Sequence, residues 1–263
     1  MESMEKVEDY IIQWLNDYAD KSNMKGFVVG ISGGIDSALT STLCAMTGKA
    51  LLCLEMPIKQ VEDQLIRSSK HIKWLEAKYR NVRSIRLNLD SVFDSFCSVL
   101  PESKYRDAHE LSLANTRARL RMSSLYYFAA LNKYLVTGTG NKVEDFGVGF
   151  YTKYGDGGVD LSPIADLSKT KVFELANHLN IIDDIQKAQP TDGLWGDQRT
   201  DEDQLGATYP ELEWAMDAHE KNLSSSEFNT RQKEVFEIFK GHFNQNQHKM
   251  QPIPICKIPE KLI

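Results

Sequence analysis

A short glycine-rich segment combines the residue types that bind phosphate. It reads Gly30, Ile31, Ser32, Gly33, Gly34, Ile35, Asp36 and Ser37. The segment lies between a strand-like apolar run and a helical pattern, so successive backbone N–H groups can point into one concavity at the positive end of a helix dipole. Glycines at positions 33 and 34 permit positive φ and close approach of phosphate oxygens, and Ser32 and Ser37 add hydroxyl donors. The segment therefore predicts a phosphate-binding turn.

Asp36 is the residue of this turn that does not suit a phosphate by itself, because like charges repel. A divalent cation would remove the conflict, and Mg²⁺ favours one or two carboxylates together with phosphate oxygens and water. Asp36 thus indicates magnesium, although an N-cap-like Asp in an ordinary glycine turn explains the same residue. Neither Gly-x-x-x-x-Gly-Lys-Ser/Thr nor Gly-x-Gly-x-x-Gly occurs, which argues against P-loop kinases and GTPases and against dinucleotide oxidoreductases.

Strand-like and helical patterns alternate along the first half of the chain. Apolar runs typical of buried strands occupy residues 26–31, 50–56, 82–87 and 135–138, and helical patterns occupy residues 7–18, 36–46, 61–79 and 108–134. Such alternation implies parallel pairing with right-handed crossovers. We therefore expect an α/β fold with a doubly wound, mainly parallel sheet flanked by helices.

The second half of the chain is richer in glycine and has fewer long apolar runs. Its patterns predict a helix over 168–179 that is N-capped by Ser168, a polar loop over 189–208, and helices over 212–220 and 225–243. A Pro-rich C-terminal tail is expected from about residue 244. We expect a single domain over residues 1–263, because α/β folds of this length commonly hold one core.

The composition excludes several classes of partner. The chain has 31 Lys and Arg against 37 Asp and Glu, a formal net charge of −6. This acidic excess argues against nucleic acid or anionic lipid, since both attract a basic surface. The sequence shows neither a leader-like start nor an apolar run long enough for a membrane span, so we expect a cytoplasmic protein. The cysteines show no metal-ligand or CxxC spacing and predict free thiols: Cys44, Cys53, Cys97 and Cys256.

Four motifs together resemble one enzyme family. The Ser-Gly-Gly-x-Asp-Ser pattern at 32–37 resembles the signature of the ATP pyrophosphatases, whose loop grips pyrophosphate while the α-phosphate is attacked. Residues 115–122, 137–145 and 150–163 are similar to segments of the NAD synthetases, and the resemblance extends from about Tyr10 to Lys249. It implies an adenine nucleotide alpha hydrolase-like fold and a homodimer with dinucleotide sites at the subunit boundary.

The resemblance assigns roles position by position. The positions that match ATP contacts are Gly30, Ile31, Ser32, Gly33, Gly34, Ile35, Asp36, Ser37, Thr139, Lys169 and Thr191. Asp36 and Glu144 match the magnesium ligands. The positions that match contacts to deamido-NAD, the nicotinic acid adenine dinucleotide, are Arg119, Lys153, Asp160, His248 and Lys249. A solvated charged face is the alternative for Arg119, and a surface ion pair is the alternative for Lys153 and Asp160. We expect a much smaller role for Arg121 than for Arg119.

The catalytic candidates are Asp36, Lys169 and Asp156. A lysine suits the charge that develops on the phosphates. Asp156 lies in a Tyr-Gly-Asp-Gly turn and is a candidate for holding the incoming ammonium or taking its proton, with a turn-forming Asp as the alternative.

The implied reaction is the ATP-dependent amidation of deamido-NAD by ammonia through an adenylated carboxylate, which gives NAD, AMP and pyrophosphate. The 263 residues leave no room for the amidase domain of glutamine-dependent relatives, so ammonia is the expected nitrogen donor. The loop over 189–208, with Trp195 as its apolar part, is expected to close over the adenylate and exclude water. The alternatives are another ATP pyrophosphatase, such as a tRNA-thiolating enzyme, and a non-catalytic ATP-binding module.

Overall fold

Parallel strands form the central sheet of the computed structural model, which describes residues 4–60, 62–191 and 200–262. The strands are β1 (Gly26–Gly30), β2 (Ala50–Glu55), β3 (Val82–Arg86) and β4 (Tyr134–Val136). They are ordered β3-β2-β1-β4, and Gly26 pairs with Ala50 on one side and with Tyr134 on the other. Because the chain winds outward from β1 in both directions, the sheet is doubly wound, as the sequence predicts. Its topological switch point lies between β1 and β4.

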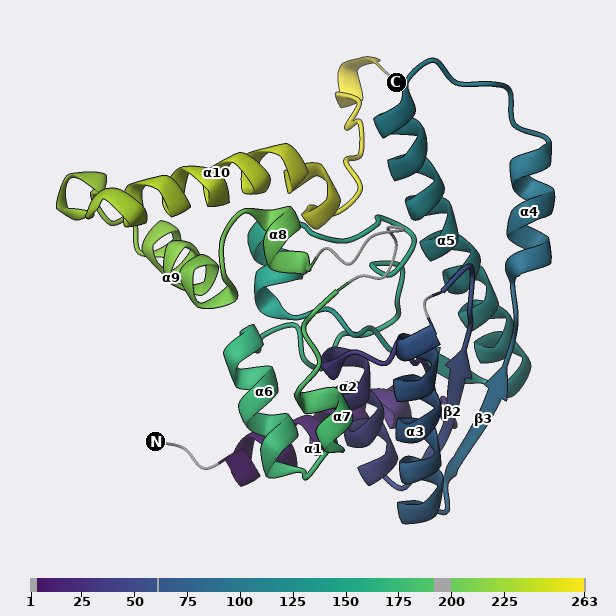
Figure 1. Ribbon diagram of the computed structural model, residues 1–263. Coiled ribbons are helices and arrows are strands. Elements are labelled where there is room, and N and C mark those ends of the chain that lie inside the picture. The colour runs from purple at the N-terminus through teal and green to yellow at the C-terminus, as the bar shows by residue number, and fades with distance from the viewer. Residues whose placement is uncertain (1–3, 61, 192–199, 263) are drawn as a thin grey trace.

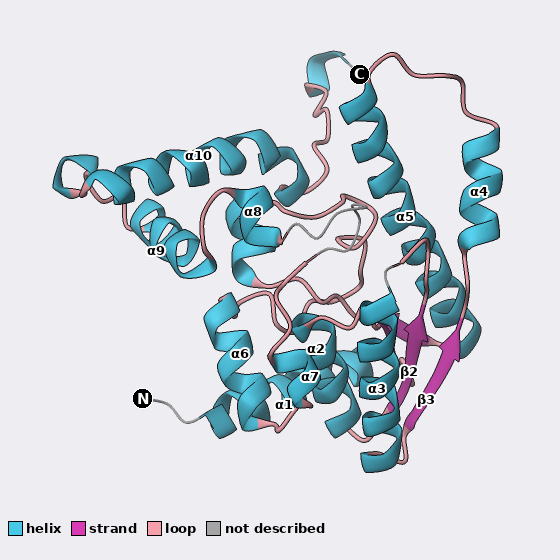
Figure 2. Cartoon of the chain, viewed as in Figure 1, coloured by secondary structure: helices cyan, strands magenta, loops and turns pink. Residues whose placement is uncertain are grey.

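Helices surround this sheet (Figure 1). They are α1 (Met4–Lys21), α2 (Ile35–Met46), α3 (Glu62–Lys78), α4 (Asp90–Ser98), α5 (Arg106–Asn132), α6 (Lys169–His178), α7 (Asp183–Gln186), α8 (Asp201–Leu205), α9 (Tyr209–Glu220) and α10 (Thr230–Met250). Shorter helical turns are the π-helical η1 (Val143–Val148) and the 3₁₀ turns η2 (Ser225–Glu227) and η3 (Glu260–Leu262). Figure 2 shows how small the share of strand is beside that of helix.

Both faces of the sheet are covered, which explains why its strands are apolar throughout rather than alternating. Side chains on a strand point to opposite faces in turn. Phe27 and Val29 of β1 are fully buried among α1, α2, α3, α6 and α7, whereas Val28 is fully buried on the other side, against α4 and α5. The sheet is therefore the middle layer of three.

A third cluster of apolar side chains lies apart from the sheet. It joins η1, α9 and α10 around Phe239 and Leu212, which are both fully buried. In Figure 1 the α9–α10 pair projects away from the strands. None of the helices in the described part of the chain has the length and apolar character needed to cross a bilayer. All four cysteines are free thiols, as predicted.

The structure corrects several element boundaries. Helix α5 ends at Asn132 rather than at 134, because Lys133 adopts the left-handed conformation (φ 60°) and Tyr134 already pairs in β4. The predicted polar loop contains the short helix α8, N-capped by Thr200. Helix α10 continues to Met250, so the irregular C-terminal segment starts at Gln251 and not near 244. Helix α4 was not predicted, whereas the N-cap at Ser168 is confirmed by the bond that its hydroxyl accepts from the Lys171 N–H.

A buried histidine links helices α2 and α3, which cover the same face of the sheet. The His71 side chain on α3 is fully buried, its Nε2 lies 3.0 Å from Ser41 Oγ on α2, and its ring stacks on Trp74 at 5.6 Å. Burial lowers the pKa of His71 to about 4, because the charged imidazolium is poorly solvated there.

We expect His71 to make the fold sensitive to acid. Between pH 6.5 and pH 4 the unfolded chain binds a proton at this position and the folded chain does not, so the free energy of unfolding falls as the pH falls. The loss should approach about 3 kcal/mol, since one pKa unit corresponds to roughly 1.4 kcal/mol. Urea unfolding at pH 7 and pH 4.5 should show a smaller drop for His71→Gln than for the parent protein. Equal drops would contradict this assignment.

Candidate active site

The predicted phosphate-binding turn connects the carboxyl end of β1 to the N-terminus of α2. The Ser32 and Ser37 hydroxyls lie 3.1 Å apart, Ser37 Oγ donates to the Gly34 carbonyl, and the Gly34 N–H donates to Ser32 Oγ. Gly33 has a φ of +85°, and a Cβ built on it would lie 2.6 Å from the Gln64 carbonyl oxygen of α3. Gly34 is extended with a φ of −94°, so only the first of the two glycines uses the positive φ that the sequence allows.

A buried lysine joins two carboxylates beside this turn. Lys169 Nζ lies 2.6 Å from Asp36 Oδ2 and 2.9 Å from Glu144 Oε1, and its side chain is only 3% exposed. Asn141 Nδ2 donates to the other oxygen of Asp36 at 3.1 Å, and the Tyr209 hydroxyl donates to Glu144 Oε1. The cluster thus draws its members from α2, η1, α6, α9 and the loop after β4.

Two opposing effects set the protonation states of this cluster: burial of each group disfavours its charged form, and pairing with an opposite charge favours it. Burial acts to lower the pKa of the Lys169 ammonium, but the two adjacent carboxylates outweigh burial and raise it, so the lysine stays charged. Burial acts to raise the pKa of Glu144, yet Lys169 and the Tyr209 hydroxyl lower it below the ordinary value. Burial raises the pKa of the neighbouring Asp145 to about 8, and the charges of Glu144, Asp156 and Asp36 add to that rise. Burial also raises the pKa of Asp36, although Lys169 acts to lower it. Lys169 is therefore a fixed cation among carboxyl groups that differ in how readily they ionise.

The predicted ATP and magnesium residues surround connected hollows at the switch point. A cavity of about 440 Å³ is lined by residues from the ends of β1, β2 and β4 and from α5. The predicted residues on its wall are Gly30, Ile31, Ser32, Asp36, Ser37, Thr139, Glu144, Asp156, Thr191 and Lys249. A smaller hollow that shares Ser32, Asp36 and Thr191 with it is lined by Gly33, Gly34, Ile35 and Lys169. Segments that lie far apart in the sequence thus meet where an open α/β sheet binds its ligand.

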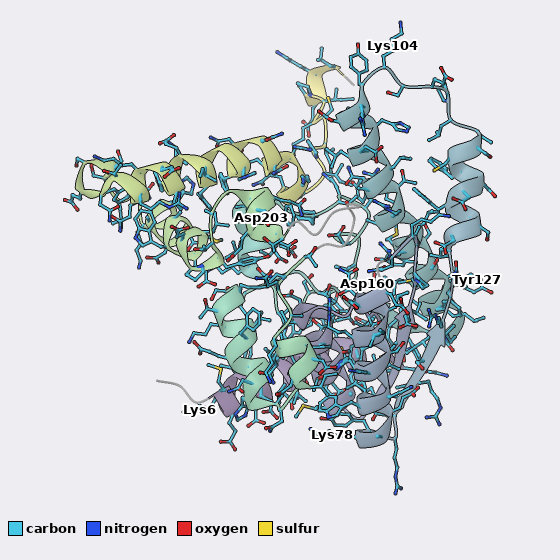
Figure 3. The ribbon with its side chains drawn as sticks, in the orientation of Figure 1. Lys6, Lys78, Lys104, Tyr127, Asp160 and Asp203 are labelled. Carbon is cyan, nitrogen blue, oxygen red and sulfur yellow. The ribbon has the colours of Figure 1, made fainter. Side chains whose placement is uncertain are left out.

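Four of the predicted deamido-NAD residues lie outside this cavity. Arg119 is exposed and its guanidinium donates to the Lys153 carbonyl, while Lys153 Nζ donates to the His248 carbonyl at 2.7 Å. Asp160 accepts from the Tyr126 hydroxyl and from the Val136 N–H, so it does not form the surface pair with Lys153 that was the alternative explanation. Asp160 is labelled in Figure 3.

Lys249 is the fifth of these residues, and it does reach the cavity wall. Its ammonium donates to the carbonyls of Gly149 and Tyr151, which ties the end of α10 to the loop after η1.

Arg121 has a larger place in the site than the sequence indicates. It lines the cavity, where its Nε donates to the Met56 carbonyl and its Nη2 donates to Gln60 Oε1, both at 3.0 Å. Burial lowers the pKa of Arg121 to about 10, and the charge of Arg117 lowers it further. The motif at 115–122 has three arginines at every second position, Arg117, Arg119 and Arg121, and the sequence pattern does not distinguish them. The packing of α5 against the loop after β2 does. Tyr209 and Asn141 were likewise not predicted as site residues, although Asn141 lies within the motif at 137–145.

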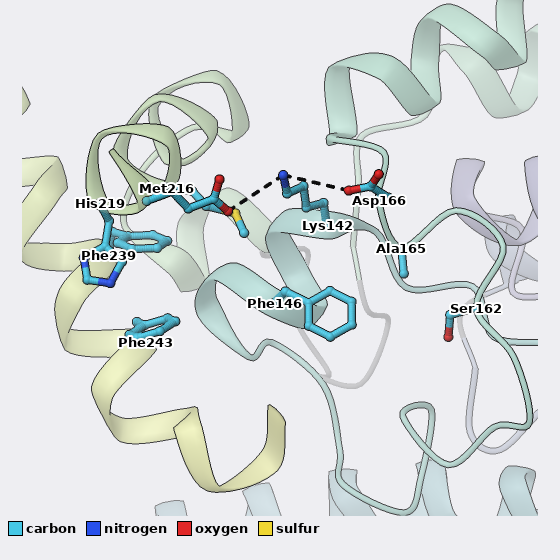
Figure 4. Close-up of a pocket in the computed structure, with 10 residues that line it drawn as sticks. Lys142, Phe146, Ser162, Ala165, Asp166, Met216, His219, Phe239 and Phe243 are labelled. Atoms are coloured by element: carbon cyan, nitrogen blue, oxygen red, sulfur yellow. Dashed lines mark ion pairs between the residues drawn. The ribbon is translucent and has the colours of Figure 1, made fainter. Parts of the chain in front are cut away.

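A second cleft lies on the other side of η1 and holds none of the predicted site residues (Figure 4). It has a volume of about 530 Å³, and apolar side chains such as Phe146, Phe243 and Met216 form most of its wall. At its rim Lys142 Nζ lies 3.9 Å from Asp166 and 3.7 Å from Glu220. The residues that the sequence predicts for the site therefore do not extend into this second cleft.

The predicted closing loop is only partly described. Thr191 lies on the cavity wall, and the Asp201 side chain at the start of α8 is buried and reaches the Tyr209 hydroxyl at 3.3 Å. Trp195 lies outside the described residues, so its expected role in closure stays a prediction.

A doubly wound parallel sheet whose first strand leads through a glycine-rich turn into a helix N-terminus is typical of nucleotide-binding α/β proteins. Comparison with known proteins gives the family. The family model described as NAD synthase matches residues 7–253, and the chain belongs to the NAD synthase family.

Individual relatives agree with this family. An NH(3)-dependent NAD(+) synthetase from Methanosarcina acetivorans is 42% identical over 209 residues, which cover 78% of each chain. The solved structure of an NH3-dependent NAD synthetase from Campylobacter jejuni is similar with a TM-score of 0.78 at 26% identity, over 97% of this chain and 100% of that chain. The structure of an NMN synthetase from Francisella tularensis has a TM-score of 0.82 at 27% identity, over 98% and 99%.

Gly33 should be far less replaceable than Gly48, although both have positive φ. A Cβ at Gly33 would collide with the Gln64 carbonyl, whereas nothing lies within 4 Å of a Cβ at Gly48, where φ is +75°. Gly48→Ala should lower the free energy of unfolding by about 1 kcal/mol through backbone strain alone. Gly33→Ala should cost at least about 1–2 kcal/mol more, because α3 must shift. Urea unfolding checks both, and equal losses would refute the steric argument.

Lys169→Met should destabilise the protein by about 3–5 kcal/mol, because it leaves Asp36 and Glu144 buried without their cation. The triple variant Asp36→Asn, Glu144→Gln, Lys169→Met should recover most of the loss, since no unpaired charge is left. Lys171→Met is the matched control on the same helix, where the exposed pair with Glu174 contributes at most about 1 kcal/mol. Chemical denaturation measures all three. A triple variant as unstable as Lys169→Met would contradict the electrostatic cause.

Proposed function

We propose that this protein catalyses the ATP-dependent amidation of deamido-NAD by ammonia, with NAD, AMP and pyrophosphate as products. The observation that carries the proposal is the buried Lys169 held between Asp36 and Glu144, immediately beside a glycine turn at the N-terminus of α2. Membership of the NAD synthase family and the ammonia-dependent NAD synthetases among its relatives support it. These same findings favour it over a tRNA-thiolating enzyme and over a non-catalytic ATP-binding module.

The turn over residues 30–37 and Lys169 would hold the ATP phosphates. Backbone N–H groups at a helix N-terminus and a nearby ammonium both stabilise negative charge that builds up on phosphate oxygens. Since its carboxylate neighbours raise the pKa of Lys169, the residue acts as a fixed positive charge and not as a proton donor. Thr139 and Thr191 lie on the same wall, where they would contact the nucleotide.

Asp36 and Glu144 would hold the magnesium ion. Their carboxylates are close enough to share one ammonium, and Mg²⁺ commonly binds one or two carboxylates together with phosphate oxygens. The donor set therefore fits the metal, which when bound would neutralise phosphate charge and orient the leaving pyrophosphate.

The chain's own contribution to the chemistry would be positioning and charge. The nicotinate carboxylate attacks the α-phosphorus of ATP, and the turn amides and Lys169 stabilise the charge that passes to pyrophosphate. Ammonia then attacks the adenylated carbonyl, and AMP leaves. Asp156 lies on the cavity wall and accepts a hydrogen bond from the Thr152 N–H, so one oxygen shapes the turn while the other would hold the incoming ammonium.

The remaining expectations concern substrate contacts and assembly. Arg119, Lys153, Asp160 and His248 would bind deamido-NAD together with Lys249. Because the first four lie outside the cavity of a single chain, a homodimer with its dinucleotide sites at the boundary accounts for their placement. We further propose a single domain over residues 1–263 and a cytoplasmic location.

A second candidate is amidation of the corresponding mononucleotide. The similarity to the Francisella tularensis NMN synthetase over nearly the whole chain favours testing it. Activity with nicotinic acid mononucleotide that exceeds activity with deamido-NAD would replace the first proposal by this one.

We expect pyrophosphate release to depend on both deamido-NAD and ammonium. Asp36→Asn should lower kcat by at least about 10²-fold, as expected when the charge that anchors the metal is removed, while leaving the unfolding curve cooperative. Asp166→Asn, which changes a fully exposed carboxylate outside the cavity, is the control and should keep full turnover. A coupled pyrophosphate assay with ammonium or glutamine as nitrogen source measures this. Full activity of Asp36→Asn would overturn the metal assignment, and release without deamido-NAD would overturn the reaction.

A further inference from the structure

The C-terminal arm, residues 251–262, leaves its apolar side chains in solvent. Ile253, Ile255, Ile258 and Leu262 are between 57% and 81% exposed, and every residue of the arm is exposed. Exposed apolar residues that occur singly are ordinary on a protein surface, but four within ten residues of one segment indicate a surface that meets another molecule. Figure 1 shows the arm leaving α10 as an extended chain before the short turn η3.

The arm is also stiffer than its lack of helix or strand indicates. Pro252, Pro254 and Pro259 fix φ in the extended region and restrict the residue before each. Such a segment loses little conformational entropy when it binds, which favours docking of the whole arm on a partner surface.

The outer face of α4 offers a matching surface. Val92, Phe96 and Val99 follow one another at intervals of four and three residues, so they form one stripe along the helix, and they are between 40% and 77% exposed. Phe93, on the side of α4 next to the stripe, is buried and anchors the helix to the core. The stripe thus belongs to a fixed helix.

The charges of the two surfaces are opposite. Residues 88–112, which span α4 and the start of α5, contain five carboxylates and two Lys or Arg. The arm contains Lys257 and Lys261 against Glu260. The arm therefore has a small positive charge and the α4 region a negative one, and such complementary charges steer and orient a contact.

The base of the arm is tied to the predicted substrate residues. Lys153 Nζ donates to the His248 carbonyl, and Arg119 on α5 donates to the Lys153 carbonyl. A contact that holds the arm therefore also bears on the exposed half of the deamido-NAD site.

We propose that the C-terminal arm of one copy packs its isoleucines against the Val92–Phe96–Val99 stripe of a second copy, and that the second copy's arm does the same in return. Two identical contacts related by a twofold axis close the assembly, as expected for an isologous dimer. This inference rests on the homodimer in the proposed function, and adds the surfaces that hold it together.

Sedimentation across a concentration series tests the two surfaces. Ile253→Ser with Ile255→Ser, and separately Val92→Ser with Phe96→Ser, should each raise the dimer dissociation constant at least tenfold. Ile66→Ser with Leu223→Ser is the control, because both residues are about equally exposed elsewhere on the molecule, and should leave it unchanged. Dissociation constants unchanged in both test variants, or a protein that is monomeric throughout, would overturn the inference.

Crosslinking through the arm's native thiol tests the register. In a Cys97→Ser background, Cys256 is the exposed cysteine, and Ser95→Cys adds a thiol beside the α4 stripe. A short bismaleimide should then give a covalent dimer on a denaturing gel, whereas Ser226→Cys, on η2, should not. Dimers that form with Cys256 alone would indicate that arm meets arm, and would refute docking on α4.

The two proposals fail separately. Turnover is measured with deamido-NAD and ammonium on the same samples. If the protein forms NAD and the arm variants do not affect dimerisation, the arm contact is wrong and the reaction stands. If dimerisation depends on the arm but no NAD is formed, the reaction is wrong and the arm contact stands.

Discussion

The site depends on one electrostatic constraint, which is the burial of the Lys169 ammonium between two carboxylates. Asp36 and Glu144 raise the pKa of the lysine enough to keep it charged despite burial. When all three groups are ionised, the cluster has a net charge of −1. Asn141 then donates a hydrogen bond to Asp36, and the Tyr209 hydroxyl donates one to Glu144. Such a cluster is costly to bury and is strongly destabilised when one member is lost, so its geometry is held by several elements at once. The cluster therefore places two carboxyl groups and one ammonium beside the glycine-rich turn.

The doubly wound sheet explains how residues from distant segments reach this constraint. The carboxyl ends of β1, β2 and β4 lie at one edge, and the order β3-β2-β1-β4 opens a crevice where the winding direction changes. Asp36 enters from the helix after β1, Glu144 from the π-helical turn after β4, and Lys169 from the start of α6. The α9–α10 unit supplies Tyr209 from outside the sheet, and it also carries Lys249 to the far wall of the cavity. Side chains from the sheet layer and from the α9–α10 unit thus meet at the cavity.

The molecule has two unlike surfaces around this cavity. The inner one is lined by buried charge and is complete within a single chain. The outer one carries Arg119, Lys153 and His248, the apolar stripe of α4 with acidic residues around it, and the apolar arm, and it has the mixed apolar and charged character of an interface. The second cleft lies along η1, the element that also carries Glu144, but most of its wall is apolar, which distinguishes it from the charged cavity.

The sequence by itself determined the strands, most helices and the glycine-rich turn after β1, because apolar periodicity and glycine placement are local properties that act through neighbouring residues. The glycine-rich turn singled out Asp36, whereas Glu144 and Lys169 were singled out by the resemblance to the NAD synthetases. The tertiary structure alone decided that these three touch, that Arg121 and not Arg119 lines the cavity, and that α10 continues to Met250. It also decided that Tyr209 donates to Glu144. These features depend on which faces of distant elements pack together. The helical pattern of α5 predicts the spacing of its arginines, but it does not predict which residues of other elements they contact.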